Sequence, residues 1–163
     1  MKKIGIISDT HNYLDPKFLD FFEPCDLIIH AGDIGSLEIA DKLSKFKKLI
    51  AVSGNIDDYN TKLQYPLEQR FKIEEVEIYL THIGGFPGKY SQKSKKILES
   101  NPPQIFICGH SHILRVMYDK KYDTLVINPG AAGQYGIQPK KTAIRLKIDG
   151  KEIKDLEICE LNR

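Results

Sequence analysis

The chain has 163 residues, a length that predicts one domain, over residues 1–163, with a sizeable core. Lysine and arginine number 24 against 22 aspartate and glutamate residues, so the formal net charge is +2. This balance excludes a protein that binds nucleic acid by charge alone, because such proteins carry a strongly basic footprint. The hydrophobic content of 41% is too high for a disordered chain and is ordinary for a globular protein.

The N-terminal apolar run meets Asp9 after a few residues, which is too short for a secretory signal. No window approaches the roughly 18 to 20 continuous apolar residues of a membrane span, so we expect a cytoplasmic protein with no membrane partner. The three cysteines are far apart and predict neither a disulfide framework nor a thiolate zinc site. Each is expected to be a small buried apolar residue: Cys25, Cys108 and Cys159.

Short apolar runs bounded by turn residues recur through the first two thirds of the chain. They are rich in isoleucine, valine and leucine, which predicts strands buried on both faces. These runs cover residues 4–8, 27–30, 49–52, 76–81 and 105–108. Helical patterns lie between them, the first beginning at Asp15-Pro16, the second at the N-cap Ser36 and a third over residues 91–99. Alternating strands and helices over the first 52 residues predict a parallel sheet.

The last third predicts strands with little room for helices between them, at residues 115–119, 125–128, 142–148 and 152–158. Asp149-Gly150 is typical of a two-residue hairpin turn. A second hairpin is expected at Glu74-Glu75. Together the patterns predict an α/β protein with two sheets, in which helices cover the outside of the first half.

Each of the five buried runs is followed by aspartate, asparagine or histidine. In an open α/β sheet, ligands bind beyond the carboxyl ends of the strands, so these side chains are the first candidates for a site. They are, in chain order, Asp9, His11, Asp33, Asn55, His82, His110 and His112.

The spacing of these residues favours a metal site. Residues two apart in extended chain project to the same side about 6.6 Å apart, so Asp9 with His11, and His110 with His112, can each converge on a small ligand. Seven oxygen and nitrogen donors exceed the need of one tetrahedral metal and suit two ions that share a carboxylate. Imidazole, carboxylate and amide donors without thiolate favour manganese, iron, zinc, nickel or cobalt, without selecting among them.

In this order, the patterns D-x-H, G-D, G-N, H and G-H-x-H resemble the calcineurin-like metallophosphoesterase superfamily, and the short chain is closest to its small bacterial and archaeal phosphodiesterases. The resemblance extends over residues 3–148. It implies a four-layer αββα sandwich of two mixed β-sheets flanked by helices, with a dinuclear metal site at the strand ends. The implied roles are a first ion on Asp9, His11 and His112, a second ion on Asn55, His82 and His110, and a bridging carboxylate from Asp33.

The resemblance also implies the reaction. We expect two divalent ions, manganese first, with zinc, nickel, iron, cobalt or magnesium as alternatives. Two ions about 3.5 to 4 Å apart acidify a shared water and hold phosphoryl oxygens, so the expected reaction is hydrolysis of a small phosphodiester by a metal-bridging hydroxide. The positions expected to be catalytic are Asp33, Asn55, His82 and His110.

The sequence departs from the larger phosphatases of the superfamily in one motif. They have G-N-H-[DE], whose histidine stabilises or protonates the leaving group, whereas this chain has Gly54-Asn55-Ile56-Asp57. Ile56 cannot transfer a proton, so a metal-bound water or the solvent is the expected proton source. Asp57 matches the acidic position and is expected to orient a ligand.

Several alternatives stay open. The same fold could be a non-catalytic metal-binding scaffold, because one branch of the superfamily resembles the retromer cargo-recognition subunit. It could also be a nuclease or a phosphomonoesterase of the superfamily. The near-neutral net charge disfavours nucleic acid as a substrate. Self-association as a homodimer is also open. Outside the pattern, His30 is expected to be structural, Asp58 a surface turn residue, and the lysines from 89 to 96 a solvated helix face, or else an attraction for an anionic substrate.

Overall fold

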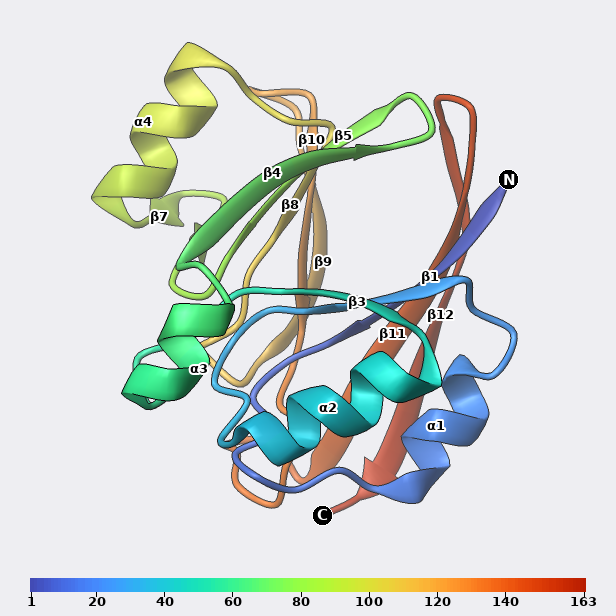
Figure 1. The fold of residues 1–163 in the computed structure, drawn as a ribbon. Coiled ribbons are helices and arrows are strands. Elements are labelled where there is room, and N and C mark those ends of the chain that lie inside the picture. Colours follow the sequence, from blue (N-terminus) through green and yellow to red (C-terminus); the bar gives the residue numbers. More distant parts are fainter.

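The computed structural model describes residues 1–163, which form two five-stranded sheets, a two-stranded hairpin and four helices (Figure 1). The first sheet contains, in spatial order, β12 (Glu152–Asn162), β11 (Lys140–Asp149), β1 (Lys2–Ile7), β2 (Leu27–His30) and β3 (Lys48–Ala51). The second contains β4 (Glu68–Ile73), β5 (Val76–Thr81), β8 (Ile105–Ile107), β10 (Thr124–Pro129) and β9 (Leu114–Asp119). The small hairpin pairs β6 (Gly85–Phe86) with β7 (Lys89–Tyr90).

The helices are α1 (Pro16–Phe22), α2 (Leu37–Phe46), α3 (Tyr59–Gln64) and α4 (Gln92–Ser100). None of them has the length and apolar character that crossing a membrane requires.

Both sheets are mixed. In the first, β1, β2 and β3 are parallel, while β11 runs antiparallel to β1 and β12 antiparallel to β11. In the second, β5, β8 and β10 are parallel, and β4 and β9 are antiparallel edge strands. Parallel strands within each sheet end at the same edge, so the loops that follow them are brought together there.

Alternation along the strands builds three apolar layers. Ile4 and Ile6 of β1 face the gap between the sheets, where they meet Ile105 and Ile107 of β8 in one buried cluster. Neighbouring residues face outward, as Phe106 does when it packs under α4. Because successive strand side chains point to opposite faces, strands buried on both faces must be apolar throughout, as the sequence runs are.

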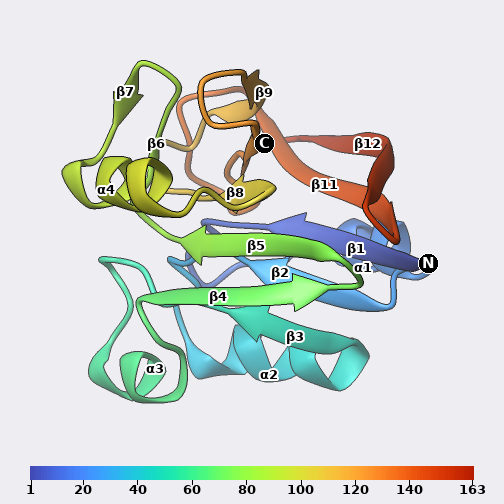
Figure 2. The same ribbon diagram turned by 90° about the horizontal axis from the view of Figure 1, so that it is seen from above.

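The layers are stacked as α1 and α2, the first sheet, the second sheet, and α4. The apolar faces of α1 and α2 pack on the outer face of the first sheet, and α4 covers the outer face of the second (Figure 1). Seen from above, β4 and β5 lie over β1 to β3, with α3 apart from both helix layers (Figure 2). The prediction of two mixed sheets flanked by helices is therefore confirmed.

The structure corrects four local expectations. The loop of the last hairpin is Gly150 and Lys151, one residue later than expected, because Asp149 pairs with Glu152 across the ladder. The second correction concerns Ser36, which is at the N-cap of α2 but donates its hydroxyl to Asn12 Oδ1, at 2.5 Å, and makes no cap hydrogen bond.

The third correction is α3, a short helix that the sequence analysis missed. Asp58, expected to be a turn residue, is its N-cap, and its Oδ1 accepts a hydrogen bond from the Thr61 backbone N–H at 2.9 Å. The fourth concerns the cysteines, since Cys25 and Cys108 are buried but Cys159 on β12 is only half-buried.

Candidate metal centre

The structure brings all seven predicted residues to one edge of the molecule. They come from the loops that follow β1, β2, β3, β5 and β8. Six of them form two groups whose potential metal-binding atoms lie within 4.8 Å of one another. The first group is Asp9, His11, Asp33 and His112, and the second is Asp33, His82 and His110. Asp33 belongs to both groups, and Asn55 joins the second, since its Oδ1 is 3.1 Å from Nδ1 of His110.

Five of these residues have a left-handed backbone, with φ between 45° and 70°. They are Asp9, His11, Asp33, His110 and His112. Such a conformation in a non-glycine residue costs on the order of 1–3 kcal/mol, although aspartate and histidine tolerate it better than most. Its concentration at these strand ends shows that the fold turns the chain sharply to aim the side chains at a common point.

Two glycines let the loops approach the carboxylates closely. A Cβ atom on Gly54 would lie 2.1 Å from Asp33 Oδ1, and one on Gly109 would lie 2.7 Å from Asp9 Oδ2. Any other residue at either position would push the loop away. The glycines of the G-N and G-H patterns are therefore needed for the geometry of the site.

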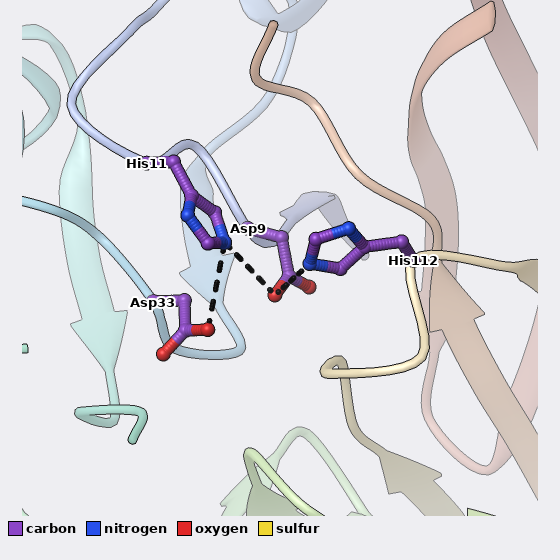
Figure 3. A group of neighbouring side chains, drawn as sticks. All are labelled: Asp9, His11, Asp33 and His112. Atoms are coloured by element: carbon purple, nitrogen blue, oxygen red, sulfur yellow. Dashed lines mark ion pairs between the residues drawn. The ribbon is translucent and has the colours of Figure 1, made fainter. Parts of the chain in front are cut away.

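Asp9 is fully buried, and its two oxygens have different surroundings. Oδ2 accepts hydrogen bonds from the Ser8 hydroxyl at 2.7 Å and from the His110 backbone N–H at 3.1 Å. Oδ1 makes no hydrogen bond, yet Nε2 of His112 lies 3.2 Å away and Nε2 of His11 lies 3.8 Å away (Figure 3). Nε2 of His82 is also 3.8 Å from Oδ1. One oxygen is thus held by the protein, and the other faces three imidazoles.

Asp33 is arranged in the same way. Its Oδ1 accepts a hydrogen bond from the Ile56 backbone N–H at 3.0 Å. Its Oδ2 lies 3.2 Å from Nε2 of His82 and 3.5 Å from Nε2 of His11, and both nitrogens are buried without a hydrogen bond. Asp33 therefore presents a free oxygen to histidines of both groups.

The tautomer of His82 is fixed by its surroundings. Its Nδ1 lies 2.7 Å from the backbone carbonyl oxygen of Ala31, which can only accept, so Nδ1 carries a hydrogen. In neutral His82, the lone pair of Nε2 then points at the carboxylate of Asp33. Either a proton or a cation must lie between these two electron-rich atoms, since buried polar groups without partners are costly. This donor set fits divalent metal ions.

The electrostatics of the site follow from the same contacts. Burial opposes ionisation of Asp9, but the nearby rings of His11 and His112 outweigh it and hold the pKa of that carboxyl well below its usual range. Burial also works against ionisation of Asp33, and the pKa of its carboxyl is nevertheless lowered, mainly by His82. The pKa values of His11 and His82 are raised, for His11 chiefly by Asp9, and for His82 by Asp33 and Asp9 against the effect of burial.

Asp57 holds two of the loops together. Its buried carboxylate accepts three backbone hydrogen bonds, from Gly54 at 2.7 Å, Gly35 at 2.9 Å and Ile34 at 3.2 Å. The loop after β3, which carries Asn55, is thereby fastened to the loop after β2. Asp57 contacts the backbone beside the predicted ligands, which is where a residue that orients them is expected to lie.

Asn128, on the second sheet, also holds a loop of the site in place. Its side-chain amide donates to the Gly109 carbonyl at 2.9 Å and to the Ser111 hydroxyl at 3.0 Å. Its Oδ1 accepts from the Gly130 backbone N–H at 3.0 Å. These bonds fix the loop that carries His110 and His112.

His30 lies outside the ligand groups, as predicted. It is fully buried, Nδ1 accepts a hydrogen bond from the Gly32 backbone N–H at 3.1 Å, and Nε2 lies 3.0 Å from the Thr10 hydroxyl. Both ring nitrogens are thus satisfied within the protein. Burial lowers the pKa of His30 to about 4.

A cleft that was not predicted from the sequence lies beside the second group. Asn55 and His82 lie on its wall, together with Lys62 of α3 and Lys93 of α4. The lysine-rich segment expected as a solvated helix face contributes Lys93 to this cleft. Lys62 belongs to no motif, and no pattern in the sequence predicts its place in the cleft.

Comparison with known proteins defines the class of this fold and site. A family model described as the calcineurin-like phosphoesterase superfamily domain matches residues 1–151. The chain belongs to the calcineurin-like phosphoesterase superfamily, and the resemblance predicted from its sequence is confirmed.

Two curated relatives from Methanocaldococcus jannaschii are similar to the chain. A probable metallophosphoesterase is 32% identical over 154 residues, covering 91% of this chain and 77% of that protein. A phosphodiesterase is 29% identical over 149 residues, covering 82% of this chain and 86% of that protein.

Solved structures share the same architecture. An archaeal phosphodiesterase superimposes with a TM-score of 0.75 at 25% identity, over 98% of this chain and 99% of that one. Vps29 from Entamoeba histolytica, solved in complex with zinc, superimposes with a TM-score of 0.77 at 19% identity, over 98% of each chain. At that lower identity the similarity to Vps29 concerns the fold alone.

Proposed function

We propose that this protein is a divalent-metal-dependent phosphodiesterase. In this proposal, Asp9, His11 and His112 hold one ion, and Asn55, His82 and His110 hold a second. Asp33 contacts both. The observation that carries the proposal is the pair of donor groups that share one carboxylate. Three of their buried atoms make no hydrogen bond: Asp9 Oδ1, His11 Nε2 and His82 Nε2.

Bound ions would supply the positive charge that holds phosphoryl oxygens and lowers the pKa of a shared water, which is the chemistry of two-metal hydrolases. The protein's own contacts would hold the side chains that donate to the metal in place before an ion binds. Ser8 holds one oxygen of Asp9, Ile56 N–H holds one oxygen of Asp33, and Ala31 fixes the His82 ring. Asp33, Asn55, His82 and His110 surround the proposed position of the second ion, beside the cleft.

The site offers no protein group to protonate a leaving group at the position where larger phosphatases have histidine. Ile56 occupies it and is 47% exposed. A leaving group that is stable as an anion needs no such acid, so we expect aryl diesters to react more readily than alkyl diesters. The relatives named as phosphodiesterases support a diester rather than a monoester as substrate.

A matrix of metals against generic substrates tests this function. The metal-free protein is loaded with manganese, zinc, nickel, iron, cobalt or magnesium, and assayed with bis(4-nitrophenyl) phosphate and 4-nitrophenyl phosphate. We expect metal-dependent turnover that favours the diester, with manganese the first ion to try. A preference for the monoester would overturn the diesterase assignment.

The non-catalytic scaffold is the alternative outcome of the same matrix. Metal binding without hydrolysis of either substrate would favour it. Binding to DNA with a steep salt dependence would instead favour a nuclease, although the net charge of +2 gives little support to that.

A further inference from the structure

The cleft beside the proposed second ion has a volume of about 360 Å³. This is the size of the smaller ligand-binding clefts, so it suits one arm of a substrate better than a whole large ligand. Asn55 and His82 line it, together with residues of α3, α4 and the segments around β4 and β5. A substrate whose phosphate is held by the donor groups would therefore extend one ester arm into it.

The charge of the cleft is one-sided. Two lysines, Lys62 and Lys93, line it, and no aspartate or glutamate does. Lys93 is already neutralised, because its Nζ lies 3.1 Å from Glu68 Oε2, and that carboxylate also accepts a hydrogen bond from the Tyr79 hydroxyl. Lys62 forms no ion pair. Its ammonium group is the free positive charge of the cleft.

The cleft also has an apolar part. Leu67 and Ile83 line it and are 62% and 49% exposed. Large aliphatic side chains this exposed at a concave site lose contact with water when an apolar surface packs on them, which is favourable. The cleft thus combines an apolar wall with one unpaired cation.

We propose that this cleft is a specificity subsite for a phosphodiester arm that has both an apolar or aromatic portion and a second anionic group. Leu67 and Ile83 contact the apolar portion, and Lys62 binds the anion. A nucleotide-like arm with a further phosphate has this chemistry. The inference rests on the proposed function, because that function places the reacting phosphate next to Asn55 and His82.

Calorimetric binding of two probes tests the subsite without requiring catalysis. Adenosine 3′,5′-bisphosphate and adenosine 5′-monophosphate are titrated into manganese-loaded protein. We expect the bisphosphate to bind about tenfold more tightly, the effect of one charge-assisted contact. Lys62→Ala should remove this preference. Lys42→Ala, which deletes an exposed lysine of α2 outside the cleft, is the matched control and should keep it.

A second variant keeps the test decisive. Glu68→Gln removes the carboxylate that neutralises Lys93, so it should strengthen bisphosphate binding. Equal affinity of the wild-type protein for both probes, or a preference that survives Lys62→Ala, would overturn the subsite. Hydrolysis of bis(4-nitrophenyl) phosphate is measured separately: turnover without a probe preference refutes the subsite alone, and a probe preference without turnover refutes the proposed function alone.

Discussion

Asp33 and His82 face each other across 3.2 Å, carboxylate oxygen to imidazole nitrogen, although the nitrogen makes no hydrogen bond. The carbonyl of Ala31 places the hydrogen of His82 on the other ring nitrogen. In neutral His82, two lone pairs therefore meet in a buried place, and a cation between them would satisfy both. Asp33 has the same relationship to His11 at 3.5 Å, which makes it the residue on which both donor groups depend.

Asp33→Asn tests that dependence. The amide keeps the shape of the side chain and can still accept from Ile56 N–H, but it replaces the charged oxygen shared by the two donor groups. We expect divalent-metal affinity to fall by more than about 100-fold, beyond the effect of residues that only support ligands. The measurement is metal content after dialysis, together with turnover of bis(4-nitrophenyl) phosphate. Asp41→Asn, on the exposed face of α2, is the control, and unchanged metal content in Asp33→Asn would contradict the account.

Asp57→Ala tests the fastening of the two loops. It leaves three backbone N–H groups without their acceptor, those of Gly54, Gly35 and Ile34. We expect the free energy of unfolding in EDTA to fall by about 3 kcal/mol, from the cost of unpaired buried donors. Metal affinity should also fall, by about 10- to 100-fold. Urea denaturation and metal titration measure the two effects, and a variant as stable as Asp41→Ala would show that these bonds contribute little.

The strands, and the placement of the candidate ligands directly after them, could be predicted because each depends on a local pattern. Runs such as residues 105–108 are apolar at every position, as a strand buried on both faces must be. The predictions that were wrong concern features that depend on tertiary contacts. The hydroxyl of Ser36 donates to Asn12, which lies in another loop, instead of capping α2. The register between β11 and β12 places the turn at Gly150 and Lys151.

The missed residues have a similar explanation. The six-residue α3 has no apolar face to reveal it, since Leu63 is 67% exposed and Thr61 is buried. Lys62 acquires its place in the cleft from that helix alone. No spacing in the sequence connects it to Asn55 or His82, which line the same cleft from other elements.

Ile56→His tests the missing proton donor. Because Ile56 is 47% exposed, the change should alter stability by less than about 0.5 kcal/mol. A positioned imidazole can act as a general acid, so hydrolysis of an alkyl 4-nitrophenyl diester at the alkyl ester bond should rise by about tenfold or more. Release of 4-nitrophenolate, which leaves readily as an anion, should change little. An equal change in both rates would show that the imidazole does not protonate the leaving group.

His30 makes a pH-dependent contribution to stability. Its pKa is lowered by burial to about 4 in the folded protein, against 6.5 for an exposed histidine. The unfolded chain therefore takes up a proton as the pH falls below about 6.5, and the folded protein does not, so stability is lost on acidification towards the folded pKa. Between pH 7 and pH 5 this loss should be about 2 kcal/mol.

His30→Gln removes this term while keeping a donor and an acceptor. Urea denaturation of both proteins in EDTA at pH 7 and pH 5 isolates it, because the other titrating groups are common to both. The variant should lose about 2 kcal/mol less than the wild-type protein over this interval. Equal losses would mean that His30 is not held neutral by the fold.

Anomalous X-ray scattering at the manganese edge, from crystals of the manganese-loaded protein, shows directly whether two ions occupy the two donor groups. We expect two peaks, one among Asp9, His11 and His112, the other among Asn55, His82 and His110, with Asp33 contacting both. A single peak, or none at these residues, would refute the dinuclear site.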